Sequence, residues 1–91
     1  MIGNGAFKAL ADPTRRRILE LLNGQEMTAG DIAGHFPIAF PSVSRHLGIL
    51  KGAELVASRR EGQNVVYRLN TTVVQDIARY LIKGLGGDDD A

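Results

Sequence analysis

The sequence predicts one mainly α-helical domain that carries a single small β-hairpin, in the order α-α-α-α-β-β-α. Five segments place apolar residues at helical spacing, and two short segments between residues 55 and 69 have strand character. Hydrophobic residues make up 44% of the chain but aromatic residues only 5%, which favours packed helices of Leu, Ile, Val and Ala. Because a chain of 91 residues buries only about 60 to 65% of its unfolded surface, its core is thin and a partner subunit would add burial.

The first two predicted helices are separated by a restart of the chain. The first covers Asn4–Ala11, with Phe7 and Leu10 on one face. Asp12 can then accept from free backbone N–H groups and Pro13 suits the first helical position, so a second helix follows at once. This helix ends before Asn23-Gly24, and it carries an arginine cluster, Arg15 to Arg17, beside the apolar stripe of Ile18, Leu21 and Leu22.

The next two helices are closely spaced. Thr28 and Asp31 form a capping-box pattern, and apolar residues continue this third helix to Pro37. The fourth helix begins near Phe40 or Pro41 and ends near Gly52. Its buried positions are predicted to be Val43, Leu47 and Leu50, and its outward positions Pro41, Ser44, Arg45 and Gly48.

The last third of the chain predicts two strands and a helix. Leu55–Arg60 and Asn64–Leu69 are the strands, joined by Glu61-Gly62-Gln63, and Asn70 or Thr72 can cap the helix that follows. The apolar stripe of this helix is wider than one neighbour needs, which indicates a self-association surface bordered by Tyr80. Its members are Val73, Val74, Ile77, Ala78, Leu81, Ile82 and Leu85.

The charges divide the chain into a basic body and an acidic end. The net charge is only +1, but three of the ten acidic residues are Asp88, Asp89 and Asp90. Residues 1–87 therefore carry 11 basic and 7 acidic side chains, a formal charge of +4. We expect one domain over residues 1–87 and a solvated, disordered tail over 88–91.

Several classes of protein are excluded by what the sequence lacks. It has no cysteine, which removes disulfides, thiolate catalysis, thiolate metal sites and thiol redox sensing. It has no apolar run of membrane-spanning length and no signal-peptide pattern, so we expect a cytoplasmic protein without membrane insertion. No spacing supports paired catalytic carboxylates, a Ser-His site or a phosphate-binding glycine loop, so we expect no enzyme, no catalytic residue and no cofactor.

Two helices followed by a hairpin with basic residues form a winged helix-turn-helix, which places one helix in the major groove of DNA and the hairpin, the wing, beside it. Arg45 can pair with guanine or phosphate, and the two serines before it can bond phosphates or base edges. Singly, each polar residue is equally explained as ordinary surface, and only their coincidence on one helix face and one wing favours DNA. The candidate DNA-binding residues are Phe40, Pro41, Ser42, Ser44, Arg45, His46, Arg59, Arg60, Gln63 and Asn64.

Four segments carry a resemblance to a known family: FKALADPTRRRILELL (7–22), MTAGDIAGHF (27–36), PSVSRHLGILKGAELV (41–56) and REGQNVVYRLN (60–70). Together they resemble the ArsR family of winged-helix repressors, and the MTAGDIA stretch and the NTTVVQD start of the last helix are most similar to its SdpR autorepressor branch. The resemblance implies a homodimer, joined by the first and last helices, that binds an inverted repeat and blocks transcription until a signal releases it. The expected interface residues are Phe7, Leu10, Val74, Ile77, Ala78, Tyr80, Leu81 and Leu85.

The chain departs from the family pattern at two places. Ala39 stands where the family commonly has a capping residue, and Phe40 follows where the family is often polar or basic. Phe40 either meets a thymine methyl or packs against the protein, and we favour packing. The family's paired cysteines and its Asp and His ligands on the last helix are missing too, since Asp76 has no histidine partner there, so no metal site is expected.

The function predicted is that of a sequence-specific repressor that responds neither to metals nor to thiol chemistry. The alternative is a winged-helix adaptor that docks to another protein and binds DNA weakly, which the fold alone would permit. A slope of affinity with salt on its own promoter would discriminate the two. The signal for release is left open between an anti-repressor protein, a small ligand and the repressor's own concentration.

Overall fold

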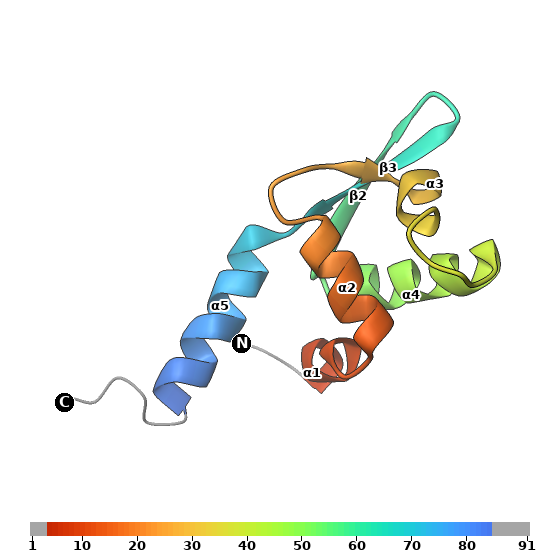
Figure 1. Cartoon of the computed structure of the whole chain (residues 1–91). Helices are drawn as coiled ribbons and strands as arrows, with labels where there is room; N and C mark the ends of the chain where they lie inside the picture. The colour runs from red at the N-terminus through yellow and green to blue at the C-terminus, as the bar shows by residue number, and fades with distance from the viewer. Residues whose placement is uncertain (1–3, 85–91) are drawn as a thin grey trace.

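The computed structural model describes residues 4–84, and within that range it contains five helices and a three-stranded sheet (Figure 1). The predicted order of elements is confirmed, with one added strand. None of the helices within this range is long and apolar enough to cross a lipid bilayer. Leu85 and the predicted acidic tail lie outside the described residues.

Helices α1 (Asn4–Leu10) and α2 (Pro13–Leu21) meet at the predicted restart. The Asp12 carboxylate accepts a hydrogen bond from the Arg15 backbone N–H at 3.0 Å, so Asp12 is the N-cap of α2. Pro13 occupies the first turn of the helix, where its missing N–H leaves no bond unmade. Ile18 and Leu21 are buried, as the apolar stripe predicts.

Helix α3 (Ala29–Ala33) begins where the capping box predicts and ends earlier than we expected. Thr28 Oγ1 accepts from the Asp31 N–H at 3.0 Å, and the Asp31 carboxylate accepts from the Thr28 N–H at 3.4 Å. The continuation to Pro37 was wrong. The N–H groups of His35 and Phe36 bond to carbonyls three residues back, at 3.0 and 3.1 Å, so the chain tightens into turns before the proline.

The sheet consists of β1 (Met27–Thr28), β2 (Val56–Glu61) and β3 (Asn64–Leu69), antiparallel in the order β1-β3-β2. The predicted hairpin is confirmed, although Glu61 pairs with Asn64, so its turn is the two residues Gly62-Gln63 rather than three. Gly62 has a φ of 61°, as the first central residue of a type II′ turn requires. Strand β1 was not predicted, because two residues are too few to show an alternating pattern.

Helix α4 (Phe40–Gly52) has the predicted bounds and the predicted buried positions. Its C-terminal end is a Schellman motif: the Leu55 N–H bonds to the Leu50 carbonyl at 3.0 Å and the Glu54 N–H to the Lys51 carbonyl at 2.9 Å. Glu54 occupies the left-handed position of that motif, with a φ of 63°. Glycine is the usual residue there, so Glu54 carries backbone strain at the end of α4.

The core lies where α2, α3, α4 and the start of β2 meet. Its largest fully buried side chains are Val43, Ile18, Leu22, Ile32, Leu47, Leu50 and Leu55. Every one of them is aliphatic, and no polar or charged side chain is buried among residues 4–84. The polar chemistry of the described chain is therefore confined to its surface.

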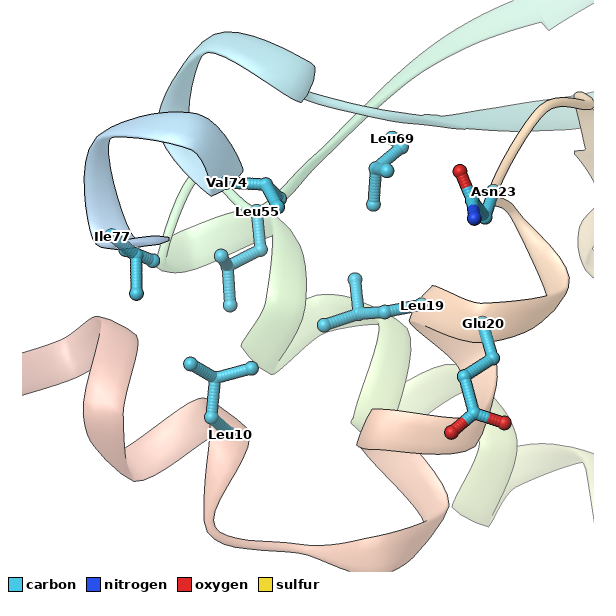
Figure 2. Close-up of a pocket in the computed structure, with 8 residues that line it drawn as sticks. All are labelled: Leu10, Leu19, Glu20, Asn23, Leu55, Leu69, Val74 and Ile77. Atoms are coloured by element: carbon cyan, nitrogen blue, oxygen red, sulfur yellow. The ribbon is translucent and has the colours of Figure 1, made fainter. Parts of the chain in front are cut away.

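Helix α5 (Thr71–Gly84) leaves the sheet directly after Asn70 and extends away from α3 and α4 (Figure 1). The Asn70 carbonyl accepts from the Val74 N–H at 3.1 Å, which places Asn70 at the predicted capping position. Only the first half of α5 rests on the body. Between this half of α5 and the body of the domain lies a cavity of about 310 Å³. Figure 2 shows the residues that line it: Leu10, Leu19, Glu20, Asn23, Leu55, Leu69, Val74 and Ile77.

Candidate nucleic-acid interface

The outward face of α4 is open to solvent over its first two turns. Val43, Leu47 and Leu50 are fully buried and fix the rotation of the helix. The side chains at Phe40, Pro41, Ser42, Ser44 and Arg45 are consequently exposed. Arg45 has no ion pair or side-chain hydrogen bond among residues 4–84, so its guanidinium donors are available to a ligand from outside the described chain. Figure 1 shows the start of α4 and the hairpin both on the side of the domain away from α5.

Phe40 is exposed, contrary to our expectation that it packs. Its side chain is 51% exposed and is absent from the residues that pack against the core. Phe36, four residues earlier, is half-buried and does pack there. The local core is thus completed by one phenylalanine, which leaves no apolar site for the second.

His46 is turned toward α2 instead of standing free on the helix face. Its ring is half-buried, with Nδ1 at 3.2 Å from the Arg15 Nη1 and 3.8 Å from the Asp12 Oδ2. Nδ1 therefore faces both the Arg15 guanidinium and the Asp12 carboxylate. His46 therefore links α4 to the start of α2, and its predicted role as a DNA donor is reduced to one ring nitrogen.

Arg15 is the centre of this link, which the sequence did not reveal. Its Nε donates to the Ala9 carbonyl at 2.7 Å and its Nη2 to the Lys8 carbonyl at 3.0 Å, both in the last turn of α1. The Lys8 carbonyl also accepts from the Ala11 N–H at 3.1 Å. The last carbonyls of a helix lack the usual N–H partner one turn ahead, so the guanidinium caps the C-terminus of α1 while touching His46 on α4. The Arg15 backbone N–H also holds the pKa of the Asp12 carboxyl below its ordinary value, assisted by the nearby His46 and Arg15 charges.

The other two arginines of the cluster, Arg16 and Arg17, make their contacts at the protein surface. Arg16 Nη1 donates to the Leu10 carbonyl at 2.8 Å, and Arg17 pairs with Glu20 at 3.1 Å in the open. Arg17 is therefore ordinary solvated helix surface. Arg15 differs, because its side chain joins three helices.

The two neighbouring arginines of β2 differ in their surroundings. Arg60, Gln63 and Asn64 are exposed near the turn, and Arg60 has no ion pair within residues 4–84. Arg59 instead pairs with Glu26 at 2.8 Å and with Glu61 at 2.7 Å. The hydrogen bonds that Arg59 donates, first to Glu26 and then to Glu61, raise the pKa of the Arg59 guanidinium above its ordinary value, and the bond from Arg59 lowers the pKa of Glu26.

This cluster ties the wing to the loop before β1. Glu26 lies 33 residues from Arg59 in the sequence, and no local pattern could have paired them. With two carboxylates on its guanidinium, Arg59 has less charge to offer to phosphates than Arg60. The structure thus separates two neighbouring arginines that the sequence treats as alike.

The candidate dimer residues fall into two groups on α1 and α5. Ile77 is 5% exposed and packs in the core of the protomer, so little of its side chain is left for a second subunit to cover. Leu10 and Val74 are half-buried and line the cavity under α5. Phe7 is half-buried and its ring contacts that of Tyr80, with centroids 5.9 Å apart.

The second half of α5 is the exposed group. Tyr80, Leu81 and Ile82 are 54%, 40% and 55% exposed, and Ala78 is exposed as well. Ile82, a member of the apolar stripe that the sequence predicts as a self-association surface, is the most exposed of the three large residues. We call this exposed second half of α5, with the side chains of Ala78, Tyr80, Leu81 and Ile82, the overhang.

The histidines and carboxylates are dispersed. Between residues 4 and 84 no three His, Asp or Glu side chains come together as metal ligands would. Asp76 instead accepts from Arg79 Nη1 at 2.8 Å, and His35 is exposed.

Comparisons with known proteins agree with this arrangement. The profile of a family described as "Bacterial regulatory protein, arsR family" matches residues 12–58. The transcriptional repressor SdpR of Bacillus subtilis (strain 168) is 54% identical over 88 residues, which cover 96% of this chain and 98% of the relative. The HTH-type transcriptional regulator Rv2034 of Mycobacterium tuberculosis is 40% identical over 86 residues, covering 90% and 80% respectively. The crystal structure of an ArsR family transcriptional regulator superposes with a TM-score of 0.82 at 28% identity, covering 90% of this chain and 84% of that one.

Proposed function

The chain belongs to the ArsR family of bacterial regulatory proteins and is a DNA-binding transcriptional repressor, and we propose that it acts as a homodimer on an inverted-repeat operator. One observation carries the proposal. The open face of α4 and the tip of the wing lie on the same side of the domain, opposite the apolar overhang of α5 (Figure 1). One side is suited to DNA and the other to a second subunit.

The contacts divide by chemistry between the two DNA-facing elements. Arg45, with Ser42 and Ser44 beside it, enters the major groove and binds base edges. Arg60, Gln63 and Asn64 on the wing bind phosphates and the adjoining minor groove. His46 and Arg59 position these elements, because their polar atoms are engaged by Arg15 and by two glutamates. In the dimer the two α4 helices lie about 34 to 36 Å apart, one turn of DNA.

The subunits meet through the overhang of α5 and the adjoining face of α1. Burial of Tyr80, Leu81 and Ile82 by a second copy would remove the largest exposed apolar side chains of α5 from water. Phe7 supports this surface from below through its contact with Tyr80. Such an isologous interface fixes the distance between the two recognition helices.

The dimer is tested by two aspartate substitutions on one helix. Leu81→Asp puts a charge on the exposed overhang, so it should give a folded monomer with weakened operator binding. Ile77→Asp puts the charge into the protomer core and should unfold the chain itself. Light scattering and circular dichroism separate the two effects, and a Leu81→Asp protein that stays dimeric would place the interface elsewhere.

DNase I footprinting on the DNA upstream of the chain's own gene tests the repressor function. A protected pseudo-palindrome is expected, with affinity that falls linearly with salt on logarithmic axes. A protein adaptor would give no protected site and no salt slope. Because bacterial operators lie in the cytoplasm, we place this activity there.

Release of the operator is proposed to be independent of metals and thiols. Among residues 4–84 no three His, Asp or Glu side chains come together as metal ligands, and Asp76 is paired with Arg79, which supports this proposal. A ligand shifts the dimer between two states only if it binds them with different affinity. Operator affinity should be unchanged by micromolar zinc. Release by zinc that is abolished in His35→Ala or Asp76→Ala would reverse this proposal. The predicted signal stays a small ligand, an anti-repressor protein or the repressor's own concentration.

A further inference from the structure

An exposed apolar surface lies at the tip of the recognition helix. Ile38 and Phe40 flank Ala39, the residue that precedes α4, and they are 41% and 51% exposed. They belong to the small group of large hydrophobic residues that stay open to water in the described chain, whose other members are Ile49 on α4 and three residues of α5. The second-subunit surface does not account for them, because the start of α4 and α5 lie on opposite sides of the domain in Figure 1.

The position of Phe40 is fixed by the first turn of α4. The Ser42 and Val43 N–H groups bond to the Ala39 carbonyl at 2.9 and 3.3 Å, and Pro41 restricts the backbone beside them. The backbone of Phe40 is therefore fixed at the helix start, and its ring lies outside the core. An aromatic side chain has only two rotatable χ angles, so it loses little conformational entropy when it meets a ligand.

Its neighbours indicate which ligand that is. Ser44 lies one helical turn after Phe40, and Arg45 is the next residue, so the ring adjoins the polar groups that we assign to the major groove. The edges of the bases in that groove present hydrogen-bond donors and acceptors and one apolar group, the C5-methyl of thymine. 5-Methylcytosine carries the same group. An apolar ring among base-reading polar side chains is complementary to this methyl group and to nothing else in the groove.

We propose that Phe40, with Ile38 beside it, is a specificity-determining residue that contacts the C5-methyl group of a pyrimidine in each half-site of the operator. The pyrimidine is thymine in unmodified DNA. The inference rests on the proposed binding of DNA through α4 and adds one apolar contact to it. It makes the operator preference of this chain depend on a group that hydrogen bonds cannot detect.

Replacement of thymine by uracil is the direct test, since uracil lacks only the methyl group. The operator is first obtained by selection from random duplexes with the wild-type dimer, and each thymine is then replaced singly by uracil. One thymine per half-site should be sensitive, with a three- to fivefold loss of affinity, the size expected for one methyl group. Phe40→Ala should bind the thymine operator more weakly and show no further loss with uracil.

Three comparisons make the result specific. Phe40→Leu keeps an apolar side chain and should keep part of the sensitivity. Ile49→Ala removes another exposed apolar residue of α4, more than two turns away, and should behave as the wild type. At the sensitive position 5-methylcytosine should bind about three- to fivefold better than cytosine, and only when Phe40 is present.

The outcomes separate this inference from the proposed function. If the wild type selects no sequence, DNA recognition itself has failed. If it selects an operator but no thymine is sensitive to uracil, or if Phe40→Ala retains the sensitivity, the methyl contact is refuted while the repressor function stands. Unchanged operator affinity of a folded Phe40→Ala protein would assign the exposed ring to a protein partner. Circular dichroism shows whether each variant folds, and the wild-type uracil scan decides the question without any variant.

Discussion

Removal of the Arg15 side chain should destabilise the domain far more than removal of either neighbouring arginine. Arg15→Ala deletes two hydrogen bonds to α1 carbonyls, at 2.7 and 3.0 Å, and the contact with His46 at 3.2 Å. Hydrogen bonds from charged donors contribute about 1.5 to 3 kcal/mol each when buried, and less for a half-exposed side chain whose acceptors can rehydrate. About 1 kcal/mol for each carbonyl bond gives a loss near 2 kcal/mol, or about 8 to 16 °C in Tm for a domain of this size.

Arg16→Ala and Arg17→Ala are matched controls on the same helix. Arg16 makes one exposed bond to a backbone carbonyl, and Arg17 one exposed ion pair, so each should cost about 0.5 kcal/mol or less. Urea denaturation at one fixed protein concentration measures all three, because dimer formation makes stability depend on concentration. Arg15→Lys should not rescue, since one ammonium group cannot reach both carbonyls and the ring. Equal losses for the three alanine variants would refute the capping role of Arg15.

Three further predictions concern the stability of the fold and change Glu26, Glu54 and Val74 in turn. Arg59 lowers the pKa of Glu26, so this carboxylate stabilises the fold above its ordinary pKa of 4.5 and ceases to do so as the pH falls through its lower folded value. Urea denaturation between pH 7 and pH 3 should therefore show that the stability advantage of the wild type over Glu26→Gln vanishes at the acidic end. A difference that stays constant with pH would contradict this. Glu54→Gly should raise the free energy of unfolding by about 0.5 to 1 kcal/mol, because glycine adopts the left-handed conformation without strain; a loss would mean that the Glu54 side chain contributes more than its backbone costs. Val74→Leu adds one methylene group to the cavity under α5 and should stabilise by about 0.5 to 1 kcal/mol in chemical denaturation, whereas a decrease would show that this space is already filled in the dimer.

The sequence predicted the elements whose signals are local. The Asp12-Pro13 restart, the Thr28–Asp31 capping box and the buried face of α4 each depend on residues within a few positions of one another. Their physical basis is a single hydrogen bond or one helical stripe, so the pattern and the structure coincide. The early end of α3 was missed because Phe36 keeps an apolar contact with the core after the helix has tightened into turns.

The missing features depend on contacts between distant parts of the chain. Glu26 meets Arg59 only after β1 has paired with β3, and Arg15 meets His46 only after α2 has packed on α4. Residue type alone assigned both Arg59 and His46 to DNA, whereas their surroundings hold them within the protein. The exposure of Phe40 was likewise decided elsewhere, because Phe36 already fills the neighbouring part of the core.

We assign the reading of bases to α4 and the binding of phosphates to the wing. This assignment is tested most directly by titrating operator and random duplexes with the wild type, Arg45→Ala and Arg60→Ala at several salt concentrations. Arg45→Ala should lose about 1 to 3 kcal/mol of operator binding per half-site and little on random DNA, so that preference at one base position is relaxed. Arg60→Ala should weaken both duplexes alike and reduce the salt slope by about one per subunit. An equal loss on operator and random DNA for Arg45→Ala as well would contradict the account, because α4 would then not be reading sequence.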